Sequence, residues 1–122
     1  DKRRPKPGQS KVMNVIGDVN DQTCIIVDDI IDSGGTIVNA AKALKERGAK
    51  EVYVYITHGV LSGDAVKKIK NSVIKNLVIT DTIDNGEKIK SVKNIEVLPV
   101  SGLMGEAIRR ISNSTSVSDL FK

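Results

Sequence analysis

Residues 24–36 read CIIVDDIIDSGGT, and this stretch decides how the rest of the sequence is interpreted. It opens with a continuous apolar run, Cys24–Val27, which is typical of a strand buried on both faces of a parallel sheet. Acids, hydroxyls and paired glycines follow and lead into a helix, for which Gly48 predicts the end. One face of that helix carries apolar residues: Ile37, Ala40, Ala41 and Leu44. Strand, turn and helix are therefore expected in direct succession.

Apolar blocks on both sides of this stretch continue the alternation. They predict strands at 12–16, 52–56, 77–79 and 95–100, and helices capped by Ser62 and Ser101. Strands that alternate with helices indicate an α/β fold with a mainly parallel sheet flanked by helices. The connections are expected to be right-handed crossovers.

The residues after the first buried strand predict a binding site, because ligands of such sheets bind at the carboxyl ends of strands. Gly34 and Gly35 permit a tight turn in which successive backbone N–H groups point at one anion. The helix that follows adds its free N–H groups, while Ser33 and Thr36 add hydroxyls. These features together predict a cradle for a phosphate monoester.

Asp28 and Asp29 need a different explanation, because carboxylates repel phosphate. A carboxylate pair accepts hydrogen bonds from vicinal hydroxyls such as those of ribose, and also holds Mg²⁺ directly or through water. A phosphate site beside a diol site fits a ribose phosphate. The alternative is a solvated aspartate cap followed by a glycine turn, with no ligand. No Walker-type nucleotide motif is present.

Length and composition limit the classes of protein to which the chain can belong. The chain has 122 residues, which suits one domain, and no apolar run reaches the roughly 18 residues of a membrane span. A single cysteine cannot form an internal disulfide, which favours a reducing cytoplasm. The chain opens at Asp1 without a methionine or a signal region, and we expect it to be a piece of a longer protein.

The net charge of +4 resides in residues 1–11, since the other residues carry 14 basic and 14 acidic side chains. Pro5, Pro7 and Gly8 argue against a helix there. Such an arm is either a solvated tail or nucleic-acid arm, or a mobile loop that closes over an anion such as a polyphosphate.

Several motifs together resemble the ribose-phosphate pyrophosphokinase family, which has the type I phosphoribosyltransferase fold. They are DKRRPKP at 1–7, KVMNVIGDV at 11–19, CIIVDDIIDSGGT at 24–36, AKALKERGAKEVYVYITHG at 41–59, LSGDAV at 61–66, EAIRRI at 106–111 and SVSDLF at 116–121. The likeness covers essentially the whole chain and corresponds to the last two fifths of such an enzyme. It implies that 1–11 is the remnant of a catalytic flexible loop and that 12–122 is a C-terminal phosphoribosyltransferase-type domain, truncated at its N-terminus and incomplete.

The resemblance implies an enzyme that transfers the pyrophosphoryl group of ATP to the 1-OH of ribose 5-phosphate, giving phosphoribosyl pyrophosphate and AMP. Lys2 and Arg4 match the catalytic loop cations, and Arg3 between them is assigned no role. The ribose 5-phosphate site is implied at Asp28, Asp29, Asp32, Ser33, Gly34, Gly35 and Thr36. Mg²⁺ is the implied cofactor, with its ligands and those of ATP mainly outside this chain and no metal ligand assigned within it, so the fragment alone is expected to be inactive.

The resemblance also implies regulation and assembly. Ser116, Ser118 and Phe121 fall in a stretch that the family uses at an inter-subunit site for phosphate and ADP. A cytoplasmic homo-oligomer, a hexamer in the full-length enzyme, is therefore expected, without a nucleic-acid or membrane partner. Two alternatives share the fold: a non-catalytic synthetase-associated regulatory subunit, and a salvage phosphoribosyltransferase. A nucleic-acid-binding module resting on residues 1–11 is a third.

The remaining chemically notable residues are interpreted structurally. His58 is expected to be a hydrogen-bonded strand-end residue, and Cys24 a core residue. Arg109 and Arg110 complement the end of the last helix. Lys67, Lys68 and Lys70 are interpreted as a solvated helix face.

Overall fold

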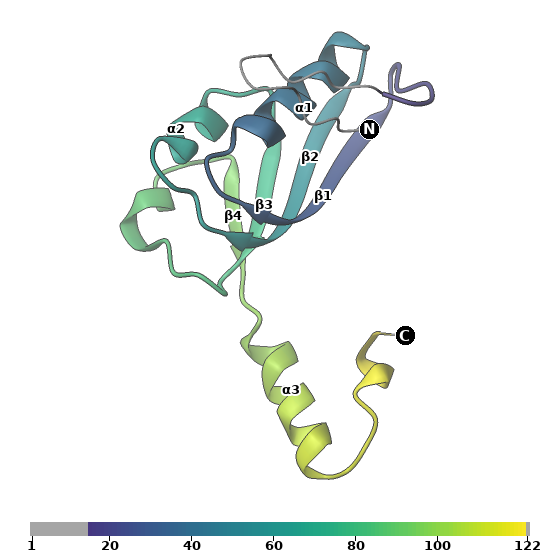
Figure 1. Ribbon diagram of the computed structural model, residues 1–122, viewed down its shortest axis with the longest axis vertical. Coiled ribbons are helices and arrows are strands. Elements are labelled where there is room, and N and C mark those ends of the chain that lie inside the picture. The colour runs from purple at the N-terminus through teal and green to yellow at the C-terminus, as the bar shows by residue number, and fades with distance from the viewer. Residues whose placement is uncertain (1–14, 122) are drawn as a thin grey trace, which may run out of the picture.

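The computed structural model describes residues 15–121, and within them the chain forms an α/β domain (Figure 1). In chain order its elements are β1 (Thr23–Ile31), α1 (Gly35–Glu46), β2 (Glu51–Gly59), α2 (Ala65–Lys70), β3 (Asn76–Thr80), a 3₁₀ turn (Gly86–Ile89), β4 (Ile95–Leu98), α3 (Ser101–Ser112) and a second 3₁₀ turn (Ser118–Phe121). The order agrees with the predicted alternation from residue 23 onward.

The four strands form one sheet in the order β1-β2-β3-β4, and every neighbouring pair is parallel. The central register places Val54 beside Leu77, and Leu77 beside Ile95. Because all strands run the same way, their carboxyl ends meet at one edge of the sheet. The predicted parallel α/β fold is confirmed.

The core lies between the sheet and the helices α1 and α2, which cover the same face (Figure 1). Its fully buried side chains include alternate residues of the two central strands: Val52, Val54, Leu77 and Ile79. Ile37 and Ala41 of α1 and Ile69 of α2 pack against them. The helix face and the end at Gly48 were predicted correctly, and Gly48 has the left-handed φ of +94° that such an end requires.

The other face of the sheet is open among the described residues, so the prediction that Cys24–Val27 is buried on both faces is wrong. Ile25 is 59% exposed and Val27 is 76% exposed, while Cys24 and Ile26 face the core. Tyr55 and Leu98 continue the exposed apolar surface across the sheet. Hydrophobic periodicity cannot distinguish one covered face from two when every residue of the strand is apolar.

Helix α3 projects away from the sheet below β4 (Figure 1). None of its residues is buried, although it is amphipathic as predicted, and Met104, Ile108 and Ile111 are more than half exposed. The carboxylate of Asp81 accepts a hydrogen bond of 2.9 Å from the Val100 amide, which fixes the chain where it leaves the sheet. This hydrogen bond links the residue before α3 to the loop after β3.

Two predicted helix caps and one predicted strand differ from the structure. Helix α2 begins at Ala65 after Asp64, and α3 begins at Ser101 after Val100; neither has a side-chain cap, so the predicted caps at Ser62 and Ser101 are wrong. The strand predicted at 12–16 falls mostly outside the described residues, and its described end, residues 15–16, is not in a strand.

Candidate functional site

The loop between β1 and α1 lies at the carboxyl edge of the sheet and has the geometry of an anion cradle. Gly34 precedes the helix with φ of +85°, a left-handed conformation that glycine adopts without penalty. As the N-cap residue it supplies no side-chain cap, and the first turn of α1 contains no acidic residue. The positive end of the helix dipole is therefore not neutralised by a protein carboxylate in that turn.

Most of the predicted ribose-phosphate residues meet around one hollow of about 230 Å³, which we call the loop hollow. Its lining residues are Asp28, Ile30, Ile31, Asp32, Ser33, Gly34, Thr36 and Ile37. Hydroxyls, helix N-terminus and carboxylates thus surround a single space of the right order for a small sugar phosphate. The structure brings these side chains together as the spacing predicts.

Two other predicted residues lie beside the hollow rather than in its wall. Asp29 is exposed, and its backbone amide donates a hydrogen bond of 2.8 Å to the Asp28 carboxylate. This bond orients the Asp28 carboxylate within β1, three residues before the strand ends at Ile31. Gly35 is the first residue of α1, and a Cβ placed on it would meet nothing within 4 Å. The predicted catalytic residues Lys2 and Arg4 lie outside the described residues.

The segment after β2 supports the loop from behind. The amides of Val60 and Leu61 donate to the Ile31 carbonyl at 2.9 and 3.2 Å, and the Ser62 amide donates to the Asp32 carbonyl at 3.0 Å. Ala65 packs behind Gly34, at 3.7 Å from the position that a Gly34 Cβ would occupy. The loop is therefore held by backbone contacts from a segment thirty residues away in sequence.

Lys68 is a residue of this site that the sequence reasoning missed. Its ammonium donates to the Ser33 carbonyl at 3.4 Å and lies 3.4 Å from the Asp64 carboxylate. The side chain is 39% exposed, so Lys68 remains on the solvated face of α2 while its ammonium reaches the loop. Helical periodicity placed it beside Lys67 and Lys70, and only the packing of α2 against α1 shows that it reaches the loop.

His58 and Cys24 have the structural roles predicted for them. The His58 Nδ1 lies 2.8 Å from the Thr82 hydroxyl, and Cys24 packs partly buried against the core. Within residues 15–121, no group of three or more histidine, cysteine or acidic side chains is arranged to hold a metal ion. In the same range, no helix is long and apolar enough to cross a membrane.

A family model described as the phosphoribosyl synthetase-associated domain matches residues 3–122. The chain belongs to the phosphoribosyl synthetase-associated domain family. This agrees with the resemblance carried by the sequence motifs.

Curated relatives of this family member carry the name ribose-phosphate pyrophosphokinase. The relative from Hyphomonas neptunium is 61% identical over 99% of this chain, and that from Buchnera aphidicola subsp. Acyrthosiphon pisum is 56% identical over all of it. In both cases the chain spans 39% of the length of the relative.

A solved structure has the same fold. Phosphoribosylpyrophosphate synthetase from Mycobacterium smegmatis superposes with a TM-score of 0.77 at 37% identity, covering 81% of this chain and 33% of that one. The α/β architecture of this family member is therefore shared with a solved synthetase.

The predicted effector residues of this family member lie on the 3₁₀ turn after α3 and just before it. The hydroxyls of Ser116 and Ser118 lie 2.6 Å apart, and Phe121 is 73% exposed. Arg110 donates to the Ser116 carbonyl at 3.1 Å and lies 3.8 Å from the Asp119 carboxylate. Arg110 therefore ties this stretch to α3, which agrees with its structural interpretation.

Glu106 holds Arg110 in that position. Hydrogen bonds from Arg109 and then Arg110 lower the pKa of the Glu106 carboxyl from its ordinary value of 4.5 to about 2. Because the folded-state pKa is depressed, the stabilisation is present above pH 4.5 and is lost as the pH falls toward 2.

We expect Glu106→Gln to loosen the stretch from 115 to 121 at neutral pH, as acid does to the unmodified chain. Amide hydrogen exchange in that stretch should become faster, whereas the exposed Glu87→Gln, which removes a pair with Lys90, should leave it unchanged. Unchanged exchange in Glu106→Gln would show that Arg110 holds the stretch without its carboxylate partner.

Proposed function

We propose that this chain forms the ribose 5-phosphate-binding part of a ribose-phosphate pyrophosphokinase. The observation that carries the proposal is the loop hollow, where the uncapped start of α1 and two hydroxyls adjoin the carboxylates of Asp28 and Asp32. Phosphate fits the helix N-terminus and hydroxyls, while the ribose diol fits a carboxylate. Relatives with that name and the matching family model support the assignment.

In the proposed reaction, the 1-OH oxygen of ribose 5-phosphate forms a bond to the β-phosphorus of ATP. The bond between that phosphorus and the α,β-bridging oxygen breaks, AMP leaves with that oxygen, and the proton of the 1-OH is released to water. Asp32 to Thr36 hold the 5-phosphate, and Asp28 holds the ribose hydroxyls with Asp29 assisting. Because the phosphate and the diol are fixed at separate points, the 1-OH is oriented for in-line attack.

Lys2 and Arg4 have an electrostatic role in this proposal. They neutralise the charge that develops on the phosphoryl oxygens and on the departing AMP. Mg²⁺ would supply charge neutralisation for the phosphates of the substrates. Asp28 is suited to contact the ion directly or through water, with the other ligands from the substrate phosphates and from outside this chain.

The proposal also states which part of the enzyme this chain forms, how the enzyme assembles and where it is located in the cell. We assign this chain to the C-terminal portion of the enzyme because of the order of its motifs, and expect a cytoplasmic homo-oligomer, a hexamer. Ser116, Ser118 and Phe121 would then bind phosphate or ADP between subunits. The alternative of a non-catalytic associated subunit shares the family model, but the presence of Lys2, Arg4, Asp28 and Asp32 favours a catalytic protein.

Calorimetric titration tests the binding half of the proposal. We expect the 122-residue chain to bind ribose 5-phosphate weakly at the loop hollow and to form no measurable AMP from ATP, since the resemblance implies ATP and Mg²⁺ sites elsewhere in the enzyme. Ribose without the phosphate should bind far less tightly. Failure to bind ribose 5-phosphate by the folded chain would contradict the assignment, as would AMP formation by a preparation free of full-length enzyme.

Lys68 supplies a second test of the site. Its ammonium lies beside Ser33, so it should attract the 5-phosphate, and Lys68→Met is expected to weaken ribose 5-phosphate binding about three- to fivefold, as for a partly exposed charge contact. Lys67→Met, one residue away on the exposed side of α2, is the matched control. Equal effects of the two changes would mean that only the general charge of the helix matters.

A further inference from the structure

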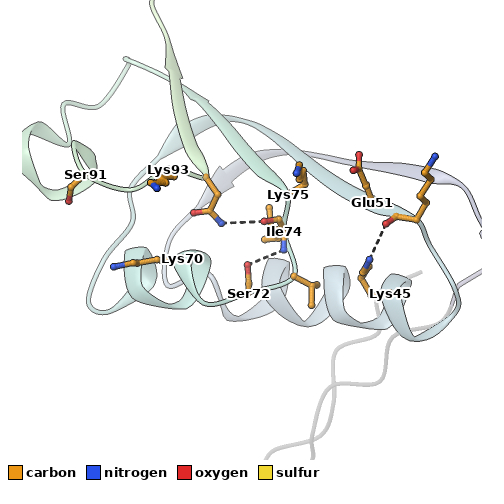
Figure 2. A pocket seen from close by; sticks show the side chains of 11 residues that line it. Lys45, Glu51, Lys70, Ser72, Ile74, Lys75, Ser91 and Lys93 are labelled. Carbon is orange, nitrogen blue, oxygen red and sulfur yellow. Dashed lines mark hydrogen bonds between the residues drawn. The ribbon is translucent and has the colours of Figure 1, made fainter.

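A second hollow, lined by five lysines, lies at the opposite edge of the sheet, where the strands begin. Its volume is about 750 Å³, and we call it the lysine groove (Figure 2). The lining residues are Lys45, Lys50, Glu51, Lys70, Ser72, Val73, Ile74, Lys75, Ser91, Lys93 and Asn94. Figure 2 shows the lysines spread along the groove, from Lys45 at one end to Lys70 and Lys93 at the other, rather than around one point.

Three of these lysines lie just before the starts of neighbouring strands. Lys50 precedes β2, Lys75 precedes β3 and Lys93 lies two residues before β4. All three are exposed, and each directly follows a buried core residue. Because the strands are parallel, their beginnings meet at one edge of the sheet, which brings these lysines into one groove.

Helix dipoles do not account for the groove. Lys45 and Lys70 lie in the last turns of α1 and α2, where a cation is favoured, but Lys50, Lys75 and Lys93 lie on the loops before strands. Lysines from two helix ends and three loops thus line one groove. Like charges repel, and a bound anion would reduce that repulsion.

The protein's own carboxylates do not supply that anion within residues 15–121. None of the five lysines is within ion-pair distance of a described carboxylate, and Glu51, the only acid in the lining, accepts a hydrogen bond of 2.9 Å from the Tyr53 hydroxyl instead. Lys45 donates to the Lys50 carbonyl at 3.0 Å. The groove thus carries five lysines against one carboxylate, and none of the five is ion-paired with a described carboxylate.

Overall composition does not explain this excess of positive charge. Beyond residue 11 the chain carries equal numbers of basic and acidic residues. Acids gather at the other edge of the sheet, where Asp28, Asp32, Asp64, Asp81 and Asp84 lie near the ends of the strands or on the loops that follow them. The two edges therefore have opposite charge, and the lysine groove is a local feature.

We propose that the lysine groove binds a short chain of linked phosphates. Lysine is a flexible point charge suited to phosphate, and an elongated row of such charges matches an elongated polyanion better than a single phosphate. No arginine or aromatic side chain lines the groove, so it offers neither planar bidentate contacts nor a surface on which bases stack. Recognition is therefore of phosphate charge, not of a base.

This proposal does not rest on the proposed function. Strand β2 runs from the groove at Glu51 to Gly59 at the opposite edge, nine residues that span roughly 26 Å at the usual rise per residue. The groove and the loop hollow are lined by different residues. A ligand in one does not reach the other.

The test uses calorimetric titration of the full chain with inorganic tripolyphosphate, and nuclear magnetic resonance to locate the bound probe. The variant Lys50→Gln/Lys75→Gln/Lys93→Gln is expected to lose about tenfold in affinity, as for three exposed charge contacts. The control Lys42→Gln/Lys67→Gln/Lys90→Gln removes the same charge from other exposed positions and should bind normally. Amide shifts should centre on residues 75 and 93.

Each result of this experiment either supports or contradicts the proposed phosphate-chain site. If ATP binds as tightly as tripolyphosphate, the groove recognises a phosphate chain, and a nucleoside triphosphate is one source of that chain. Equal losses in the two triple variants would show unspecific attraction and overturn the proposal, as would tighter binding of a DNA duplex with no tripolyphosphate binding. Loss of tripolyphosphate binding in Gly34→Val but not in the groove variant would place the probe in the loop hollow instead. Ribose 5-phosphate affinity, which should be unchanged in the groove variant, separates this test from that of the proposed function.

Discussion

Gly34→Val is expected to abolish ribose 5-phosphate binding, with a loss of about a hundredfold or more. Gly34 has φ of +85°, and a β-branched residue in that region is strained by about 1–3 kcal/mol. The new side chain would not clash with the protein, because the atom nearest to its Cβ is Ala65 Cβ at an ordinary contact distance of 3.7 Å. The strain would instead turn the loop amides away from the phosphate, and the added methyl groups would occupy its approach.

Gly17→Val is the matched control for this change. Gly17 has φ of +95° with nothing within 4 Å of a new Cβ, so the variant carries similar strain at a residue that does not line the loop hollow. Calorimetric titration of both variants, each checked for folding by circular dichroism, separates loss of the cradle from loss of stability. Normal affinity in folded Gly34→Val would refute the loop assignment.

Lys2→Ala or Arg4→Ala in the complete enzyme should lower kcat by a factor of about 10² or more. Donors that stabilise charge only as it develops in the transition state have effects of this order. The KM for ribose 5-phosphate should change much less, because the proposed site holds the 5-phosphate at residues 32–36. Steady-state kinetics with ATP and ribose 5-phosphate measures both quantities.

Arg3→Ala is the control for these two changes, since it removes the same charge from the same segment at a residue without an assigned role. It should retain most of kcat. A raised KM with normal kcat in the Lys2 or Arg4 variants would mean that these cations bind the ground-state substrate. Equal losses in all three variants would mean that the total charge of the segment matters rather than its individual residues.

The candidate site was largely predictable because its residues are contiguous. Asp28, Asp32, Ser33, Gly34 and Thr36 fall within nine positions, so a single turn brings them to one hollow once the flanking strand and helix form. Lys68 was not predictable in this way. It joins the loop from α2 by a contact across 35 residues, and no local pattern distinguishes it from Lys67.

The lysine groove illustrates the same limit on a larger scale. Its lysines are spread from residue 45 to residue 93, and in the sequence each resembles an ordinary surface cation. They form one surface only because the ends of α1 and α2 and the starts of three parallel strands meet at the same edge of the sheet.

The order of strands and helices and the parallel α/β class followed from local sequence, because short-range patterns and turn residues determine them; the same patterns placed the predicted phosphate-binding residues around the loop hollow. Tertiary structure decided which faces are covered. An all-apolar strand such as Cys24–Val27 carries no alternation, so its sequence does not show that Ile25 and Val27 are exposed while Cys24 and Ile26 face the core. The amphipathic pattern of α3 likewise predicts a helix but not that none of its residues is buried, because a local pattern does not show whether the rest of the described chain packs against its apolar side.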